Sequence, residues 1–331
     1  MLNCFILNKN MVIKRYSKSR TKFIQVSNDT GFVVTLSTLG ASIFSIKFLD
    51  ENMTSNPKNI EDFLRKDVYH GKTIGRVAGR ISDGEIVVND KTFELSKNEG
   101  KNTLHGGEGG LSQRQFKCKI EKSINQTDIL FKYVSKDLEC GFPGKANFMI
   151  RYIIPNNEAK IRVDYICWVD EDCPISLTNH SYFCLGQSSL NNLLLQINSH
   201  RFIELDSVDL TLKGIKEVPE YLDFRSLKNL TEEIDNKAMC QGKLGGYDHI
   251  MLLDGNQINL ENEKYKLSIT TNLDAVCIYT DNYDANFEAN NSSEKIRRGI
   301  AIEPQLNPLE DRILKIGKIY HHFIDYSFNT K

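Results

Sequence analysis

Two histidines and one glutamate lie in segments that interrupt an otherwise strand-like pattern. His180 sits in the polar run Ser176–Phe183, between apolar flanks, and His105 precedes two consecutive glycines. Glu303 ends an apolar run and is followed by proline. Histidine titrates near neutrality and suits proton donation. A carboxylate at the end of an apolar strand is partly desolvated, which raises its pKa and makes it a better base. These residue types predict acid–base chemistry.

A second set of residues could hold a ligand. Arg76 and Arg80 lie four residues apart within Gly75–Ile81 and are separated by small residues, so guanidinium and backbone groups could both approach a ligand. Asp248 follows a Gly-Gly turn and could accept hydrogen bonds from hydroxyl groups. Taken alone, the first segment is better explained by a surface loop with solvated arginines and the second by an ordinary turn. Together with the two histidines and Glu303, they suit proton shuttling on a neutral, polyhydroxylated substrate.

Composition excludes several other classes of protein. The 42 basic and 43 acidic residues give a net charge of −1, which is unsuited to a general nucleic-acid binder. No apolar stretch reaches the ~20 residues that span a bilayer. The eight cysteines form no Cys-x-x-Cys pair, and no His-Glu-x-x-His is present, so we expect no metal and no cofactor. Scattered cysteines without a secretion signal favour reduced thiols in a cytoplasmic protein.

The elements that must position these residues are mostly strands. Lys160–Asp170 alternates with period two, as does Tyr265–Thr270, and Ile86–Leu95 is typical of a hairpin with a tight Asn-Asp turn. Helical signals are few, the best being Asn59–Arg65 with Asn59 as a possible cap. No repeat or linker divides the chain. We therefore predict an all-β protein built as one large, mostly antiparallel β-sandwich.

The amino-terminal segment differs in charge from the rest of the chain. Residues 1–28 contain six basic residues and no acidic residue, and their apolar run is too short for a signal peptide. We predict a short basic tail and lead-in over residues 1–28 and a single β-sandwich domain over residues 29–331.

The order of several motifs resembles that of the aldose 1-epimerase (galactose mutarotase) family. The resemblance runs collinearly from about Phe32 to the C-terminus and implies a single-domain antiparallel β-supersandwich with few short helices. The matching segments are Gly75–Ile81, Asn102–Gly107, Glu139–Gly144, Leu177–Leu185, Gly246–His249, Ile302–Gln305 and Leu314–Tyr320.

The resemblance also implies roles for individual residues. Glu303 would remove the proton from the anomeric hydroxyl of a free hexose, and His180 would protonate the ring oxygen. The ring would open to the aldehyde, turn about the bond between carbons one and two, and reclose as the other anomer. Arg80, His105 and Asp248 would hold the sugar, with Tyr182 close to it. The substrate would be a small-molecule sugar, and neither a cofactor nor a metal is implied.

Three positions depart from the family pattern. Cys277 stands where many members have a sugar-facing glutamine, Gly79 replaces the commoner asparagine before Arg80, and Cys184 replaces another asparagine. We still expect Gly79 and Cys277 to lie at the sugar. Three alternatives remain open, namely a hexose-6-phosphate 1-epimerase, a disaccharide 1-epimerase and a non-catalytic carbohydrate-binding protein. The oligomeric state, monomer or homodimer, also remains open.

Overall fold

Antiparallel strands make up nearly all of the secondary structure. The computed structural model describes residues 12–236 and 245–331, and within them the one α-helix is α1 (Ile60–Phe63). It falls inside the predicted segment Asn59–Arg65, although the Asn59 side chain makes no capping hydrogen bond. The single-turn 3-10 helices are Ser82–Gly84, Leu111–Gln113, Glu139–Gly141 and Glu220–Leu222.

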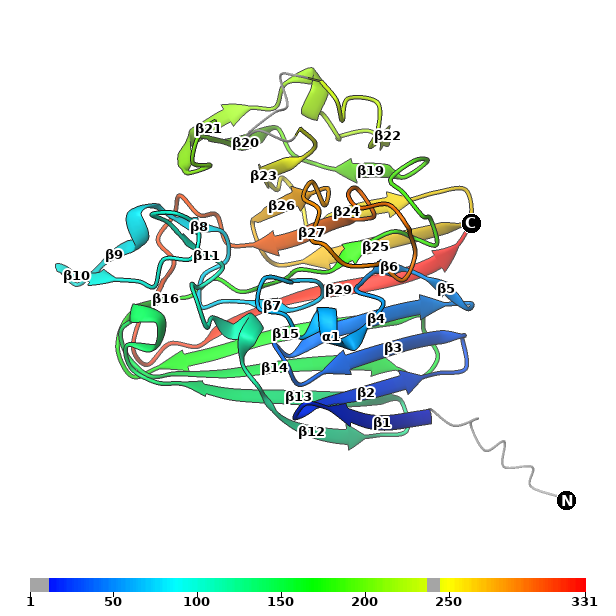
Figure 1. The fold of residues 1–331 in the computed structure, drawn as a ribbon, viewed down its shortest axis with the longest axis horizontal. Helices are drawn as coiled ribbons and strands as arrows, with labels where there is room; N and C mark the ends of the chain where they lie inside the picture. Colours follow the sequence, from blue (N-terminus) through cyan, green and yellow to red (C-terminus); the bar gives the residue numbers. More distant parts are fainter. Residues whose placement is uncertain (1–11, 237–244) are drawn as a thin grey trace, which may run out of the picture.

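Three large antiparallel sheets form the body of the protein (Figure 1). The first contains, in spatial order, β1 (Val12–Lys18), β2 (Thr21–Ser27), β3 (Phe32–Ser37), β4 (Ser42–Phe48) and β5 (Glu51–Asn52). The second contains β12 (Lys117–Lys122), β13 (Gln126–Ser135), β14 (Ala146–Pro155), β15 (Lys160–Val169), β29 (Tyr320–Thr330), β25 (Tyr265–Thr271), β24 (Gln257–Glu261), β19 (Leu194–Ile197) and β22 (Lys228–Asn229). The third contains β21 (Leu212–Glu217), β20 (Arg201–Leu205), β23 (Asp248–Leu252), β26 (Ala275–Tyr279), β27 (Ile300–Gln305), β18 (Tyr182–Phe183) and β6 (Thr54–Ser55).

Short two-stranded pairs connect and flank these sheets. They are β9 (Glu85–Val88) with β10 (Lys91–Glu94), β8 (Arg80–Ile81) with β11 (Thr103–Leu104), β7 (Thr73–Ile74) with β17 (Thr178–Asn179), and β16 (Cys173–Pro174) with β28 (Ile313–Leu314). The hairpin predicted for Ile86–Leu95 is confirmed. Its turn residues, Asn89 and Asp90, have φ of 50° and 61°, as a two-residue turn between twisted strands requires.

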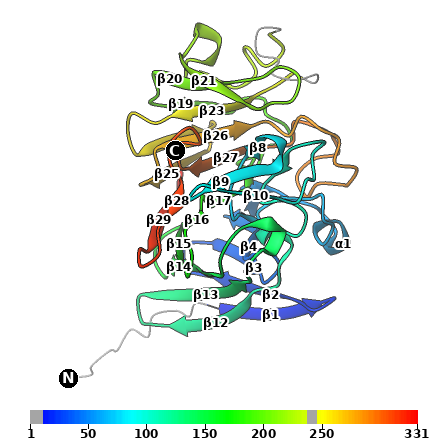
Figure 2. The same cartoon turned by 90° about the vertical axis from the view of Figure 1, so that its left-hand side faces the viewer.

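The nine-stranded sheet packs against the other two large sheets, and the core lies between the layers (Figure 2). The rings of Phe32 in β3 and Phe328 in β29 lie 5.7 Å apart. Phe183 in β18 packs on Tyr326 in β29 at 5.3 Å. The alternation predicted in Lys160–Asp170 arises because one face of β15 supplies this core. The predicted all-β sandwich is therefore confirmed.

The first sheet begins earlier than the sequence indicated. Residues 12–27, which we assigned to a lead-in, form β1 and β2, and Phe23 and Val26 are fully buried. The predicted lead-in therefore supplies two strands of the first sheet. Residues 1–11 of the predicted tail lie outside the described residues. No helix within the described ranges is long and apolar enough to cross a bilayer.

Candidate active site

One face of the seven-stranded sheet forms the floor of a cavity. Glu303 in β27 pairs with Cys277 in β26, and Tyr279 pairs with both Asp248 in β23 and Ala301. Because directly paired residues project to the same side of a sheet, and alternate residues along a strand do so as well, these side chains share one face. Tyr182 in β18 joins them through its pairing with Ala301. Strand register therefore gathers residues that lie more than a hundred positions apart in the sequence.

His180 is placed by a short pair of strands beside this floor. It directly follows β17, its amide donates to the carbonyl of Lys72 at 3.0 Å, and its carbonyl accepts from the amide of Gly71 at 2.8 Å. Its imidazole lies between the rings of Tyr69, His105 and Tyr182, whose centroids are 5.0–5.9 Å away. Backbone bonds on both sides and packed rings around it fix the direction of the imidazole.

Arg80 and His105 come from the β8–β11 pair, at the rim of the cavity. The amide of Gly79 donates to Nδ1 of His105 at 3.3 Å, and the amide of His105 donates to the carbonyl of Gly79 at 3.0 Å. The next residue, Gly106, has φ of 84°, and a Cβ there would lie 2.0 Å from the carbonyl oxygen of Gly75. Only glycine therefore fits after His105. The predicted turn is required to bring the histidine beside Arg80.

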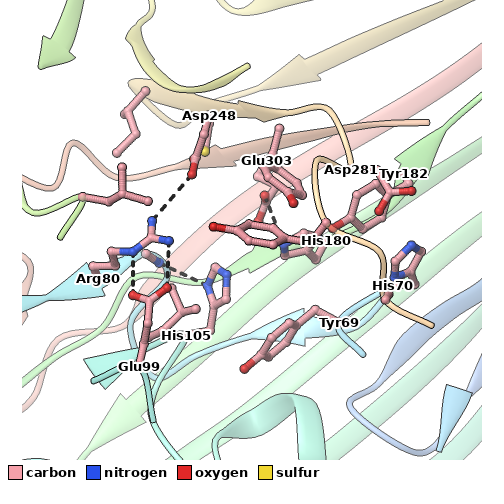
Figure 3. A pocket seen from close by; sticks show the side chains of 18 of the residues that line it. Tyr69, His70, Arg80, Glu99, His105, His180, Tyr182, Asp248, Asp281 and Glu303 are labelled. Carbon is pink, nitrogen blue, oxygen red and sulfur yellow. Dashed lines mark hydrogen bonds and ion pairs between the residues drawn. The ribbon is translucent and has the colours of Figure 1, made fainter. Parts of the chain in front are cut away.

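All eight site residues predicted from the sequence line one cavity of about 380 Å³. Figure 3 shows Arg80 and Asp248 toward one end, His180 and Glu303 in the centre, and His70 and Asp281 toward the other end. The eight lining residues are Gly79, Arg80, His105, His180, Tyr182, Asp248, Cys277 and Glu303.

The closest contact in the centre of the cavity joins a possible base and a possible acid. Nε2 of His180 lies 3.4 Å from Oε1 of Glu303, and both residues are buried. Burial raises the pKa of Glu303 well above its ordinary range, and the negative charge of Asp248 adds to this shift. Burial lowers the pKa of His180 to about 4. Nδ1 of His180 has no hydrogen-bond partner among the described residues.

Arg80 is held between two carboxylates. Its Nε and Nη2 donate to the two oxygens of Glu99 at 2.7 and 2.9 Å, and its Nη1 lies 3.8 Å from Oδ2 of Asp248. Burial alone would lower the pKa of Arg80, but the hydrogen bonds and charges of Glu99 and Asp248 raise it above its ordinary value, so the guanidinium stays charged. Burial raises the pKa of Asp248, and Arg80 opposes that rise.

Two further ionisable side chains of the cavity, Cys277 and His105, are held in their uncharged forms. Burial raises the pKa of the Cys277 thiol, and the charges of Glu303 and Asp248 raise it further, so the thiol stays protonated. Burial, with the neighbouring His180 and Arg80, lowers the pKa of His105 well below its ordinary range. No three His, Cys, Asp or Glu residues gather as metal ligands within residues 12–236 and 245–331.

Arg76 does not approach the cavity, contrary to our interpretation of the Gly75–Ile81 segment. It is buried, and its guanidinium donates to the carbonyls of Pro143, Lys136 and Gly144 at 2.8–2.9 Å. It also bonds to the hydroxyl of Ser135. Arg76 therefore anchors the turn around Glu139–Gly144. Its charge is used by the protein's own carbonyls and is not available to a ligand.

Sequence reasoning also missed several residues that line the cavity. Tyr69 and His70 lie shortly before β7 and belong to no recognised motif, and Glu99 lies three residues before the Asn102–Gly107 segment. The ring of His70 stacks on that of Tyr182 at 4.0 Å. Gln305 also lines the cavity and belongs to the Ile302–Gln305 segment, in which only Glu303 was predicted to act. Four more missed residues follow β26 or lie on it, namely Tyr279, Asp281, Tyr283 and Asp284.

The chain matches characterised proteins over nearly its whole length. The family model described as Aldose 1-epimerase matches residues 22–327. Aldose 1-epimerase of Escherichia coli (strain K12) is 29% identical over 340 residues, which cover 93% of this chain and 95% of that protein. Galactose mutarotase of Homo sapiens is 29% identical over 296 residues, covering 82% of each chain.

Solved structures share the fold. Galactose 1-epimerase from Lactobacillus acidophilus NCFM superposes with a TM-score of 0.87 at 23% identity, covering 97% of this chain and 99% of the other. A GalM/aldose epimerase homologue from C. elegans gives a TM-score of 0.84 at 24% identity, with 94% and 99% coverage. At these identities the structural likeness concerns the fold alone.

Proposed function

The chain belongs to the aldose 1-epimerase family and is an isomerase that interconverts α and β anomers, and we propose that its substrates are free hexoses of the galactose and glucose type. The names of the human relative and of the Lactobacillus structure support galactose as one substrate. A cavity of about 380 Å³ lined by carboxylates, imidazoles and a guanidinium suits a ligand rich in hydroxyl groups.

The observation that carries the proposal is the buried contact of 3.4 Å between His180 and Glu303. In our proposal Glu303 takes the proton from the anomeric hydroxyl while His180 delivers one to the ring oxygen. The bond between carbon one and the ring oxygen breaks, and the hydroxyl oxygen becomes the aldehyde oxygen. After the aldehyde turns, the same steps in reverse rebuild the ring with the other configuration. No proton is consumed overall.

The pKa shifts support a shared proton between the two groups. Raising the pKa of Glu303 and lowering that of His180 both favour uncharged forms in the empty cavity, with the proton on the glutamate. The reactive form needs a glutamate anion and an imidazolium, which together hold the same number of protons. A single proton transfer across the 3.4 Å contact therefore converts one form into the other.

The remaining predicted residues surround the reacting pair, and we assign them to binding. Arg80 and His105 offer donors at one end of the cavity, and Asp248 offers an acceptor for hydroxyl groups. Gly79 leaves space above the rim, because no atom lies within 4 Å of where its Cβ would be. Tyr182 and Cys277 contribute to the floor. We also place the enzyme in the cytosol, which the six free cysteines of the described residues support. Cys4 and Cys240 lie outside those residues.

Polarimetry of freshly dissolved α-D-galactose and α-D-glucose tests both the substrates and the roles. The wild-type protein should accelerate mutarotation of both sugars, and His180→Ala should lower the rate by about 10²–10⁴-fold. His200→Ala is the matched control, because His200 is exposed, pairs with Asp254 and lies outside the cavity. No acceleration of either sugar by the wild type would refute the substrates, and a near-normal rate in His180→Ala would refute the assigned acid.

A further inference from the structure

The cavity wall is rich in carboxylates and poor in positive charge. Among the described residues that line it, the one Lys or Arg side chain is Arg80. The cations that pair with three of the wall carboxylates do not themselves line the cavity: Arg65 pairs with Asp67, Arg298 with Asp281 and Lys295 with Asp284. The acidic residues of the wall are Asp67, Glu99, Asp248, Asp281, Asp284 and Glu303, of which Glu303 is uncharged while it holds the proton that it shares with His180.

Arg80 cannot bind an anionic ligand in the usual bidentate way, because two of its N–H groups already donate to Glu99. A guanidinium binds carboxylate or phosphate through two parallel N–H groups. In Arg80, Nε and Nη2 form this bidentate arrangement with Glu99, at 2.7 and 2.9 Å. The remaining Nη1 faces Asp248 at 3.8 Å. An anionic substituent would have to displace Glu99 before it could reach the guanidinium.

The histidines of the cavity do not supply the missing positive charge. Burial lowers the pKa of His180 to about 4, and it lowers the pKa values of His70 and His105 well below their ordinary range. All three imidazoles are therefore uncharged near neutral pH in the empty cavity. An anion entering it meets carboxylates and neutral rings, and no free cation.

We propose that Glu99 is a specificity-determining residue, because it occupies the two N–H groups of Arg80 that would otherwise bind an anion. As a result the cavity accepts neutral aldoses and aldoses that carry an ammonium group, and it rejects aldoses that carry a carboxylate or phosphate. Glu99 is held for this role by a tight turn, in which its amide and that of Asn102 each donate to the other residue's carbonyl. The inference rests on the proposed function, since it concerns which sugars the same site converts.

Three sugars that differ only at carbon six provide the test. D-galactose is neutral there, 6-amino-6-deoxy-D-galactose carries an ammonium group and D-galacturonate carries a carboxylate. Exchange NMR on the anomeric protons gives kcat/KM for each. For the wild type we expect the amino sugar to match or exceed galactose, and galacturonate to fall about 100-fold below it, because facing like charges are strongly unfavourable.

Glu99→Gln keeps the size of the side chain and one acceptor for Arg80 but removes the charge. We expect it to raise the ratio of kcat/KM for galacturonate to that for galactose by about tenfold. Glu85→Gln is the control, since Glu85 is exposed on β9 and lies outside the cavity. It should leave this ratio unchanged. Raising the salt concentration from about 0.01 M to about 1 M should raise the wild-type ratio of kcat/KM for galacturonate to that for galactose toward one. The reason is that the Debye length falls from about 30 Å to about 3 Å.

The outcomes separate this inference from the proposed function. A wild type that converts galactose and galacturonate equally well would overturn the selectivity and leave the epimerase proposal standing. An unchanged ratio in Glu99→Gln would overturn the role of Glu99. Failure of the wild type to convert galactose would instead overturn the function on which the inference rests.

Discussion

Glu303→Gln separates the proposed catalytic role of this residue from its effect on stability. The amide keeps the shape of the side chain and can still donate to Nε2 of His180 across the 3.4 Å contact, so the site should keep its geometry. It can no longer remove a proton. We expect mutarotation of galactose to fall by about 10²–10⁴-fold, with the loss mainly in kcat.

The same variant should be more stable than the wild type at neutral and higher pH. Burial raises the pKa of Glu303 in the folded protein above its value in the unfolded chain, which is about 4.3. The unfolded chain therefore ionises first, and the favourable contribution of the protonated carboxyl is lost as pH rises from about 4.3 through the folded pKa. Glutamine has no such loss. We expect a gain of about 1–3 kcal/mol in unfolding free energy at high pH, the usual cost of desolvating a polar group.

Urea unfolding at a series of pH values, combined with polarimetry, measures both effects. The difference in unfolding free energy between Glu303→Gln and the wild type should be small at pH values below about 4.3 and should grow as pH rises. An active Glu303→Gln protein would refute the base assignment. A difference that shrinks as pH rises would refute the burial argument.

Three further predictions concern other residues. Cys277→Gln should shift the KM for one hexose modestly and leave kcat largely intact, because each new hydrogen bond to the sugar contributes about 0.5–1.5 kcal/mol. A lower melting temperature with unchanged affinity for every hexose would contradict a sugar-facing side chain. Activity should survive exhaustive treatment with EDTA, and restoration of a lost activity by one divalent ion would expose a metal site. Arg76→Met should lower the unfolding free energy by about 3 kcal/mol, since it leaves buried carbonyls such as that of Pro143 without a donor; a variant of normal stability would show that the turn does not need this anchor.

His180 and Asp248 were predictable because they lie in or beside polar and glycine-containing segments, and Glu303 because it is an acidic residue at the end of an apolar run. His180, Glu303 and Asp248, which the sequence predicted to share one site, all line the same cavity. Residues without such a segment were missed. Glu99 looks like any acidic turn residue, and only the pairing of β8 with β11 brings Arg80 within reach of it.

The errors have equally specific causes. Arg76 and Arg80 have the same side chain in one short segment, and sequence does not reveal that carbonyls some sixty residues downstream, such as that of Lys136, surround the first of them. β1 lacks alternation because it is an edge strand with nearly every side chain exposed, so no period-two pattern distinguishes it from a tail. Edge strands such as β1 bury few side chains, so their sequences show little of the alternation by which strands are recognised.

The position of β29 has a consequence for how the protein is made. This strand follows the other described strands in sequence, yet it lies between β15 and β25 in the nine-stranded sheet and joins the two halves of that sheet. Until β29 is in place, each half presents an open strand edge, the kind of surface that pairs with other chains and aggregates. The contacts that β29 makes are also distant in sequence, which slows folding. We therefore expect the two halves to be prone to aggregation until β29 pairs with both of them, and deletion of Tyr320–Thr330 would divide the sheet instead of shortening it.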